Sequence, residues 1–254
     1  MPNKIDIRTA PKAKNTINNR FLDIKTHNDI KNLQINFIIF TKKTMILLCA
    51  ATEFEILPTI DYVKDRNIPD IEILITGIGS PATMYSLCKH IAANKPDGII
   101  QAGIAGTYKP DIAMGEVVVV EWEQWGDLGI EDHDAFHTLF DMRFADPNQK
   151  PYLNGRISCC FPKNFAIDKY RRVNAITCNT AHGNETGIQR IVQTFNPDIE
   201  TMEGAAAAYV CAMENIPFLQ IRSISNMVEP RCKERWNIPL AIENLNREMK
   251  LIIS

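Results

Sequence analysis

The sequence predicts an α/β fold, in which a mostly parallel central sheet is flanked by helices within a single domain. Two patterns lead to this fold class. Short apolar runs alternate with longer stretches of helical periodicity, as in parallel strands joined by crossover helices. Glycine, serine and asparagine gather directly after several of the apolar runs, where strands of such a sheet turn into their connections.

The first half of the chain predicts four strands and two helices. The strands are expected at 45–51, 71–76, 98–102 and 116–121, and the first is a continuous apolar run of the kind buried on both faces. The helices are expected at 55–66 and 80–93, where Ser80 and Pro81 form a suitable N-cap and first-turn pair. The stretch 122–155 is polar, aromatic and irregular, which indicates an insertion over a site.

The second half continues the same alternation. Strands are expected at 175–178, 199–202 and 218–223, and helices at 185–195, 203–213 and, as a closing amphipathic helix, 237–253. No repeat and no internal linker interrupts residues 45–254, so these residues are expected to form one domain.

Residues 1–44 differ from the rest of the chain. They hold seven Lys and two Arg against three Asp, a net charge of +6, and they contain no glycine. A basic arm that binds an acidic surface is one interpretation. A poorly ordered N-terminal extension is the favoured one, and a misassigned translation start before Met45 is a third.

Composition excludes several classes of protein. In a chain of 254 residues, 45% hydrophobic and 23% charged residues are ordinary for a soluble globular protein, and the net charge of −2 speaks against a nucleic-acid binder. No run approaches the roughly 20 apolar residues of a membrane helix, and no signal peptide is visible, so a cytoplasmic protein without a membrane partner is expected. No CxxC pair exists, and His133 and His137 lack a third ligand at suitable spacing, so no metal site is expected.

Ligands of such sheets bind beyond the carboxyl ends of the strands. One glycine loop there, Gly77-x-Gly79-x-x-Ala82, partly fits the dinucleotide fingerprint. The next strand ends at Gln101-Ala102 without the acid that would hold a ribose, so a nicotinamide cofactor is disfavoured. No cofactor is expected.

Five ordered motifs carry a family resemblance. They are residues 49–55 (CAATEFE), 76–79 (TGIG), 101–106 (QAGIAG), 201–206 (TMEGAA) and 222–226 (RSISN). In this order they resemble the purine nucleoside phosphorylase and nucleosidase superfamily across residues 45–254. Within it, the continuation of the last motif through Arg231 and Trp236, with the runs 127–129 and 179–183, resembles the futalosine hydrolase family.

The resemblance implies a nucleoside phosphorylase-like fold, a homo-oligomer, and a small-molecule nucleoside substrate. It further implies hydrolysis of the N-glycosidic bond of futalosine, releasing hypoxanthine and dehypoxanthinylfutalosine in menaquinone biosynthesis. Two alternatives stay open. One is a related nucleosidase or phosphorylase acting on 6-oxopurine nucleosides, and the other is a purine-nucleoside binder without catalytic activity.

The resemblance also assigns roles to residues. Glu55 takes the position of the general base, Arg222 is expected to orient Glu55 or the water, and Thr76 to hold the water. Glu203 takes the ribose position with Met202 packed under the sugar, and a cap of the following helix is its other interpretation. The remaining substrate-binding candidates are Gly79, Gly103, His182 and Arg231.

The chemistry of these residues favours hydrolysis of a 6-oxopurine nucleoside. The loop after the first strand holds two glutamates and no Lys or Arg, and a carboxylate repels phosphate and accepts a proton from water. The amide of Asn226 can donate to a 6-oxo group and accept from a protonated N7. An Asn that closes a turn is the alternative interpretation. Trp122, Trp125 and Phe136 are candidates for the aromatic end of the substrate or for the core.

Overall fold

The computed structural model describes residues 44–133, 135–159 and 167–254. The expected extension 1–44 lies outside the described residues except for Thr44. Within them, nine strands form one sheet, and a separate hairpin consists of two further strands. The sheet contains β1 (Ile46–Ala50), β2 (Ile71–Ile75), β3 (Gly98–Thr107), β4 (Val117–Trp125), β7 (Tyr152–Leu153), β8 (Arg156–Ser158), β9 (Arg171–Thr177), β10 (Ile199–Thr201) and β11 (Phe218–Met227).

The strand order is β2-β1-β3-β10-β9-β4-β8-β7, and β11 pairs with both β3 and β4. The pairs β1–β2, β1–β3, β3–β11, β4–β9 and β9–β10 are parallel. The pairs β3–β10, β4–β11, β4–β8 and β7–β8 are antiparallel. The predicted α/β class is confirmed, but the sheet is mixed, with antiparallel strands beside a parallel half.

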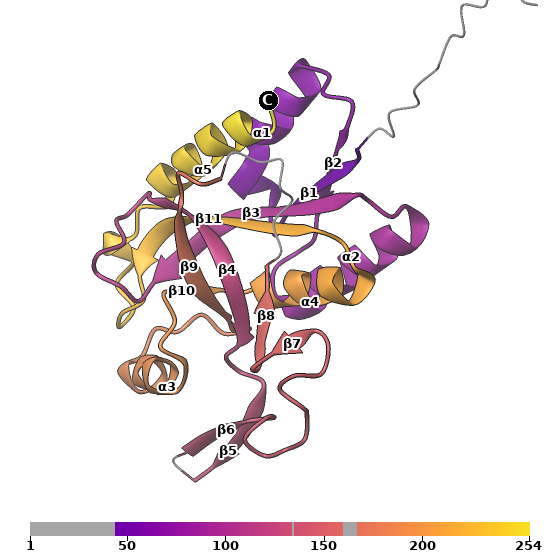
Figure 1. The fold of residues 1–254 in the computed structure, drawn as a ribbon. Coiled ribbons are helices and arrows are strands. Elements are labelled where there is room, and N and C mark those ends of the chain that lie inside the picture. Colours follow the sequence, from indigo (N-terminus) through magenta and orange to yellow (C-terminus); the bar gives the residue numbers. More distant parts are fainter. Residues whose placement is uncertain (1–43, 134, 160–166) are drawn as a thin grey trace, which may run out of the picture. The chain divides into compact units, whose positions relative to one another are not determined.

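Helices cover both faces of the sheet. They are α1 (Glu53–Asp65), α2 (Ser80–Ala93), α3 (Glu185–Phe195), α4 (Gly204–Glu214) and α5 (Ile238–Ile252). In Figure 1, α1 and α5 lie side by side on one side of the sheet and α2 with α4 on the other. A hydrophobic core lies on each face of the sheet, and strand β1 contributes to both. Leu48 and Ala50 face the α1–α5 side, while Leu47 and Cys49 face the α2–α4 side. This arrangement confirms the strand buried on both faces.

Three strands are longer than the sequence predicts. Residues 103–106, expected as a turn after a strand, lie inside β3, because β11 pairs with all of them and β10 pairs with Gly106 and Thr107 from the other side. β11 continues to Met227 through a register shift between Ile224 and Asn226. β4 reaches Trp125, so the region 122–155 begins as a sheet strand and not as an irregular insertion.

The rest of that region is also ordered into short strands. β5 (Gly129–Asp132) and β6 (Ala135–Thr138) form the hairpin that projects from the end of the sheet in Figure 1. β7 and β8 then return the chain to β4. None of the described residues of 122–155 lines the cavity at the carboxyl ends of the strands, whereas Trp125, Tyr152 and others of this region line a second cavity.

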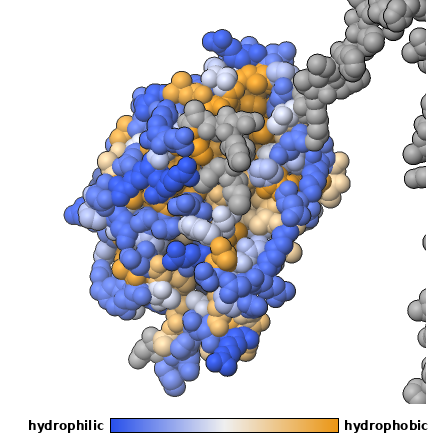
Figure 2. Space-filling view, in the orientation of Figure 1, coloured by the Kyte–Doolittle hydropathy of each residue, from blue (hydrophilic) through white to orange (hydrophobic). Residues whose placement is uncertain are grey.

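The helix starts are close to the predicted ones. α2 begins at Ser80 with a proline in its first turn, but its N-cap is Gly79, so the assignment of Ser80 as the cap is wrong. The face of the molecule shown in Figure 2 is mainly hydrophilic, with smaller apolar areas. Among the described residues, no helix is long and apolar enough to cross a membrane.

Candidate active site

A cavity of about 340 Å³ opens at the ends of β3, β10 and β11, next to the start of α1. Most of the residues expected to bind substrate meet there. Its walls include Glu55, Met202, Glu203, Asn226, His182 and Arg231. The convergence of these residues from distant parts of the chain makes this cavity the candidate active site.

Glu55 is held by both of its carboxylate oxygens. It is the third residue of α1 in a capping box, in which Oε2 accepts from the backbone N–H of Thr52 (3.1 Å) and from its hydroxyl (2.9 Å). Oε1 accepts from the backbone N–H of Ile104 on β3 (3.1 Å). The local Thr-x-x-Glu sequence thus fixes a buried carboxylate at the cavity wall, while Glu53 is exposed.

Gly103 lies where the side chains of Arg222 and Glu55 approach the backbone. A Cβ at this position would be 2.3 Å from Nη1 of Arg222 and 3.0 Å from Oε1 of Glu55. No larger residue fits there without moving one of the two charged groups. Glycine is therefore required at this point of β3 for the cluster to form.

Arg222 lies behind the cavity wall and not in it. Its side chain is almost fully buried, Nη2 donates to Oε1 of Gln101 (3.0 Å), and Nη1 lies 3.9 Å from Oε2 of Glu203. The expected orientation of a water by direct contact is not what this position supports, since Arg222 does not line the cavity. Its buried guanidinium instead interacts electrostatically with the Glu203 carboxylate and opposes the rise of its pKa.

Glu203 connects two helices at the cavity wall. It occupies the N-cap position of α4, but its side chain makes no cap hydrogen bond. Oε1 accepts instead from the backbone N–H of Gly79 (3.0 Å), whose φ of 86° suits glycine. Burial raises the pKa of Glu203, opposed by Arg222 and by the Gly79 N–H, while the nearby Glu55 raises it further.

Asn226 lies just after the register shift of β11. Its Oδ1 accepts from the hydroxyl of Ser225 (2.8 Å), and its Nδ2 donates to the carbonyl of Met227 (2.9 Å). An amide nitrogen has a second hydrogen and an amide oxygen a second lone pair. The side chain is thus fixed in orientation and still offers one donor and one acceptor at the cavity.

Two other candidates differ in position. Met202 lines the cavity, but Thr76 does not. The Thr76 hydroxyl lies 3.2 Å from the carbonyls of Ala50 and Gly77 and 3.4 Å from the Thr83 hydroxyl, all away from the cavity. The expected water contact of Thr76 is therefore not supported by its surroundings.

His182 and Arg231 also line the cavity. The guanidinium of Arg231 lies 5.0 Å from the ring centroid of Trp236, and both line the cavity. Nδ1 of His182 lies 2.6 Å from the carboxylate of Glu200. Sequence reasoning missed Glu200, although it directly precedes the Thr-Met-Glu motif.

A second missed carboxylate lies deeper. Glu123 of β4 is fully buried and accepts from Gln220 (2.8 Å) and from the Thr177 hydroxyl (3.0 Å). Its Oε1 would be 1.8 Å from a Cβ at Gly204, so it lies against the start of α4. Burial raises the pKa of Glu123 to about 7. Nothing in the local sequence marks this residue, because the partners come from β9 and β11.

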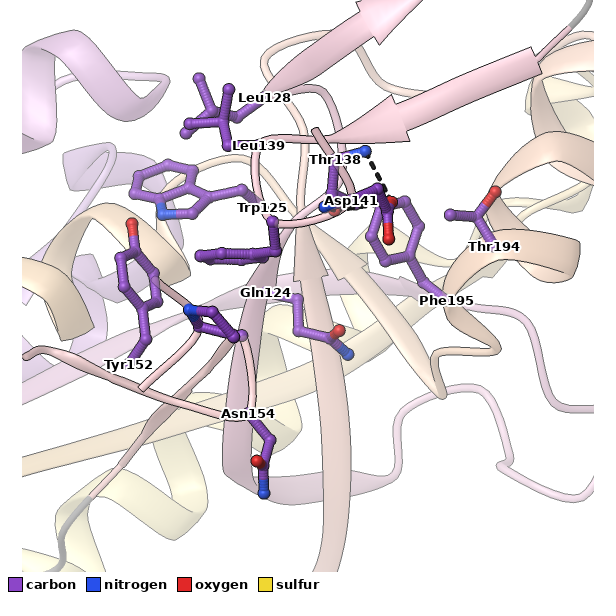
Figure 3. Close-up of a pocket in the computed structure, with 13 residues that line it drawn as sticks. Gln124, Trp125, Leu128, Thr138, Leu139, Asp141, Tyr152, Asn154, Thr194 and Phe195 are labelled. Atoms are coloured by element: carbon purple, nitrogen blue, oxygen red, sulfur yellow. Dashed lines mark hydrogen bonds between the residues drawn. The ribbon is translucent and has the colours of Figure 1, made fainter. Parts of the chain in front are cut away.

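The described residues also enclose an aromatic cavity of about 240 Å³ away from the first (Figure 3). Trp125, Tyr152 and Phe195 line it, and the carboxylate of Asp141 there already accepts two hydrogen bonds from Thr138. The two cavities share none of their lining residues. Trp125 thus lines this second cavity, and neither Trp122 nor Phe136 lines either one.

Metal-ligand atoms gather at one place in the described residues, and not at the histidine pair considered from sequence. The side chain of His133 is 96% exposed. Cys178, His182 and Glu200 bring ligand atoms within 4.8 Å of one another. Burial raises the pKa of the Cys178 thiol, and the Glu200 carboxylate is already engaged by hydrogen bonds, so the cluster is explained as a hydrogen-bond network.

Residues 69–253 match a family model described as the phosphorylase superfamily. Among curated relatives, the futalosine hydrolase of Streptomyces coelicolor is 25% identical over 188 residues, covering 71% of this chain and 77% of the relative. The futalosine hydrolase of Thermus thermophilus is 26% identical over 187 residues, covering 71% and 80%.

Solved structures show the same fold. A 5'-methylthioadenosine/S-adenosylhomocysteine nucleosidase from Colwellia psychrerythraea in complex with adenine has a TM-score of 0.66 at 17% identity, covering 84% of this chain and 95% of that one. The native structure of futalosine hydrolase of Helicobacter pylori has a TM-score of 0.67 at 16% identity, covering 83% and 97%.

Proposed function

Because the chain belongs to the phosphorylase superfamily, we propose that it hydrolyses the N-glycosidic bond of a 6-oxopurine nucleoside, with futalosine as its substrate. The products would be hypoxanthine and dehypoxanthinylfutalosine, as in menaquinone biosynthesis. The curated relatives named futalosine hydrolase support this choice at 25–26% identity.

The observation that carries the proposal is the pair of buried carboxylates, Glu55 and Glu203, in one cavity wall. A phosphorylase must hold a phosphate dianion, which needs cationic or hydroxyl-rich groups. The cation nearest to Glu203 in the described structure, Arg222, is buried and engaged with Gln101 and Glu203. Carboxylates at this place repel phosphate and suit water as the nucleophile.

The arrangement gives each group a role in hydrolysis. Glu55 accepts the proton of a water whose oxygen attacks C1' of the ribose. The C1'–N9 bond breaks, and its electron pair leaves with the purine, which takes up a proton at N7 from the surrounding water. Glu55 afterwards returns the proton of the attacking water to solvent. The carboxylate of Glu203 accepts hydrogen bonds from the sugar hydroxyls and favours the positive charge that develops on the ribose.

Asn226 supports a 6-oxopurine as the leaving base. Its free N–H donates to O6, and its oxygen accepts from the protonated N7. The first interaction stabilises the negative charge that develops on the departing base, and the second stabilises its N7-protonated form. Both lower the barrier to its departure.

A substrate panel tests the proposal with the full chain. Futalosine, inosine and 5'-methylthioadenosine are each incubated with and without phosphate, and the released base is quantified by chromatography. We expect the parent to release hypoxanthine from futalosine at a rate that does not depend on phosphate. The Glu55→Gln variant is expected to retain only a small residual rate. A requirement for phosphate, a preference for 5'-methylthioadenosine, or no turnover of any nucleoside would each contradict the proposal.

A further inference from the structure

His182 is held at the cavity by Glu200, which in turn accepts a hydrogen bond from Tyr108, and the proposed hydrolysis gives neither Glu200 nor Tyr108 a role. Its Nδ1 lies 2.6 Å from Oε2 of Glu200, and its backbone N–H donates to Oε1 of the same carboxylate (2.9 Å). The hydroxyl of Tyr108 donates to Oε2 from the other side (2.5 Å). The His182 and Glu200 side chains are only 7% and 6% exposed, so the ring has a fixed orientation.

These contacts decide where the imidazole carries its proton. Burial and the charge of Glu200 raise the pKa of Tyr108, so the phenol keeps its hydrogen and is the donor. With the Glu200 carboxylate as the acceptor, Nδ1 of His182 carries the hydrogen of their 2.6 Å contact. In a neutral imidazole the other nitrogen then carries a lone pair.

That second nitrogen is available to a ligand. Within residues 44–133, 135–159 and 167–254, Nε2 of His182 has no hydrogen-bond partner. His182 lines the same cavity as Asn226. His182 and Asn226 therefore border one cavity, and His182 also borders a second cavity together with Cys178 and Gly187.

We propose that Tyr108 and Glu200 are positioning residues that keep His182 in the tautomer with its lone pair on Nε2, and that this lone pair recognises N1–H of a 6-oxopurine base. The inference rests on the proposed function, because it takes this cavity as the site of the purine.

The chemistry of the two purine classes gives the proposal its specificity. A 6-oxopurine presents a donor at N1 and an acceptor at O6, which complement Nε2 of His182 and the amide N–H of Asn226. A 6-aminopurine presents the reverse at both atoms, an acceptor at N1 and a donor at position 6. Two side chains of one cavity would then contact two neighbouring atoms of the base, and each mismatch leaves a polar group unpaired.

Binding of the free bases tests this inference without catalysis. The dissociation constants of hypoxanthine and adenine are measured by titration calorimetry on the full chain and its variants. We expect the parent to prefer hypoxanthine and His182→Phe to lower that preference about tenfold or more, as for a lost buried hydrogen bond. Glu200→Gln, whose amide can donate to Nδ1 and move the proton to Nε2, is expected to shift the preference toward adenine.

Two further measurements keep the outcome clear. His90→Phe is the matched control, because His90 also lies near a carboxylate, Glu72 (3.5 Å), but outside the cavity. It should leave the preference unchanged. Nitrogen-15 NMR of the parent should show His182 with its hydrogen on Nδ1, and Tyr108→Phe should weaken the preference less than Glu200→Gln.

The results separate this inference from the proposed function. A parent without preference for hypoxanthine, a His182→Phe variant that keeps the parent's ratio, or a neutral His182 with its hydrogen on Nε2 would each overturn the inference. If the base preference behaves as expected but no nucleoside is cleaved, the proposed hydrolysis fails and the inference stands. If futalosine is cleaved but the base preference is the same in the parent and in His182→Phe, the inference fails and the proposed hydrolysis stands.

Discussion

Nη1 of Arg222 lies 3.9 Å from Oε2 of Glu203, and the two side chains are only 1% and 7% exposed. A buried cation beside one carboxylate offsets part of the charge that a second carboxylate, Glu55, adds to the same wall. The pair therefore explains how two acidic side chains remain close together in a buried place. It also predicts that changes near Arg222 affect both of them.

Glu55→Gln is expected to keep nucleoside binding and lose most of the hydrolysis. The amide retains the shape of the side chain but cannot accept the proton of the attacking water. A positioned general base contributes about 100- to 10,000-fold, so kcat should fall by that factor while the dissociation constant changes little. Glu53→Gln, at an exposed neighbour, is the control, and a loss of only a few-fold for Glu55→Gln would remove it from this role.

Gly103→Ala is expected to reduce stability and activity together. The added methyl would lie 2.3 Å from Arg222 Nη1, so the buried guanidinium must move away from Glu203 or the strand must shift. Such overpacking costs about 1–3 kcal/mol, measurable as a lower midpoint of urea unfolding, and kcat/KM should fall with it. Gly183→Ala, whose added methyl meets nothing nearer than 3.3 Å, should be far milder. Equal effects of the two changes would argue against the tight contact.

Asn226→Asp is expected to lower turnover of the hypoxanthine substrate and to improve relative turnover of its 6-amino analogue. A carboxylate cannot donate to O6 and leaves that oxygen unpaired, at a cost of about 1–3 kcal/mol. The ratio of kcat/KM for the two substrates should therefore shift about tenfold or more. Using a ratio removes effects on overall stability. An unchanged ratio would mean that Asn226 does not contact the base.

Glu123→Gln is expected to change how stability depends on pH. The folded-state pKa of Glu123, about 7, lies above its ordinary value of 4.5. The folded protein therefore holds this proton more tightly, and the stabilisation is complete below pH 4.5 and is lost as the pH rises to about 7. The loss is about 3 kcal/mol at most. Urea unfolding from pH 5 to 8 should show it in the parent and not in Glu123→Gln, while the exposed Glu121→Gln on the same strand should follow the parent.

Removal of residues 1–44 is expected to leave hydrolysis and thermal stability nearly unchanged. The proposed domain 45–254 contains all the site residues named above, and the removed segment carries a net charge of +6 and no glycine. The thermal midpoint and kcat/KM of the shortened chain are compared with those of the full chain. A shortened chain that cannot fold would show that the segment is part of the domain.

Local patterns in the sequence predict the helices well. α3 has the predicted bounds and α2 begins and ends where expected, because apolar periodicity and helix-end residues act within a few positions. The continuation of β3 through Gly103 could not be predicted this way. It depends on pairing with β11, in which Arg222 lies opposite Gly103, far along the chain.

In the candidate site, too, positions set by local sequence were predicted and contacts between distant segments were not. Residues at strand ends, such as Asn226 and Glu203, reach the cavity as the rule for parallel strands predicts. The side chains that orient His182 were not predicted, because contacts such as Tyr108 to Glu200 join positions 92 residues apart. Neither periodicity nor a local motif indicates a contact between residues so far apart in the sequence.

The hydrogen bond from the Gly79 amide to Glu203 connects the beginnings of α2 and α4. A backbone amide held this way exchanges its hydrogen with solvent only when the loop opens. The deuterium uptake of this single amide therefore measures how often the resting protein releases the carboxylate that would hold the ribose. A bound ligand that contacts Glu203 would slow the uptake, so occupancy of the site could be followed at the edge of α2 without labelling the ligand.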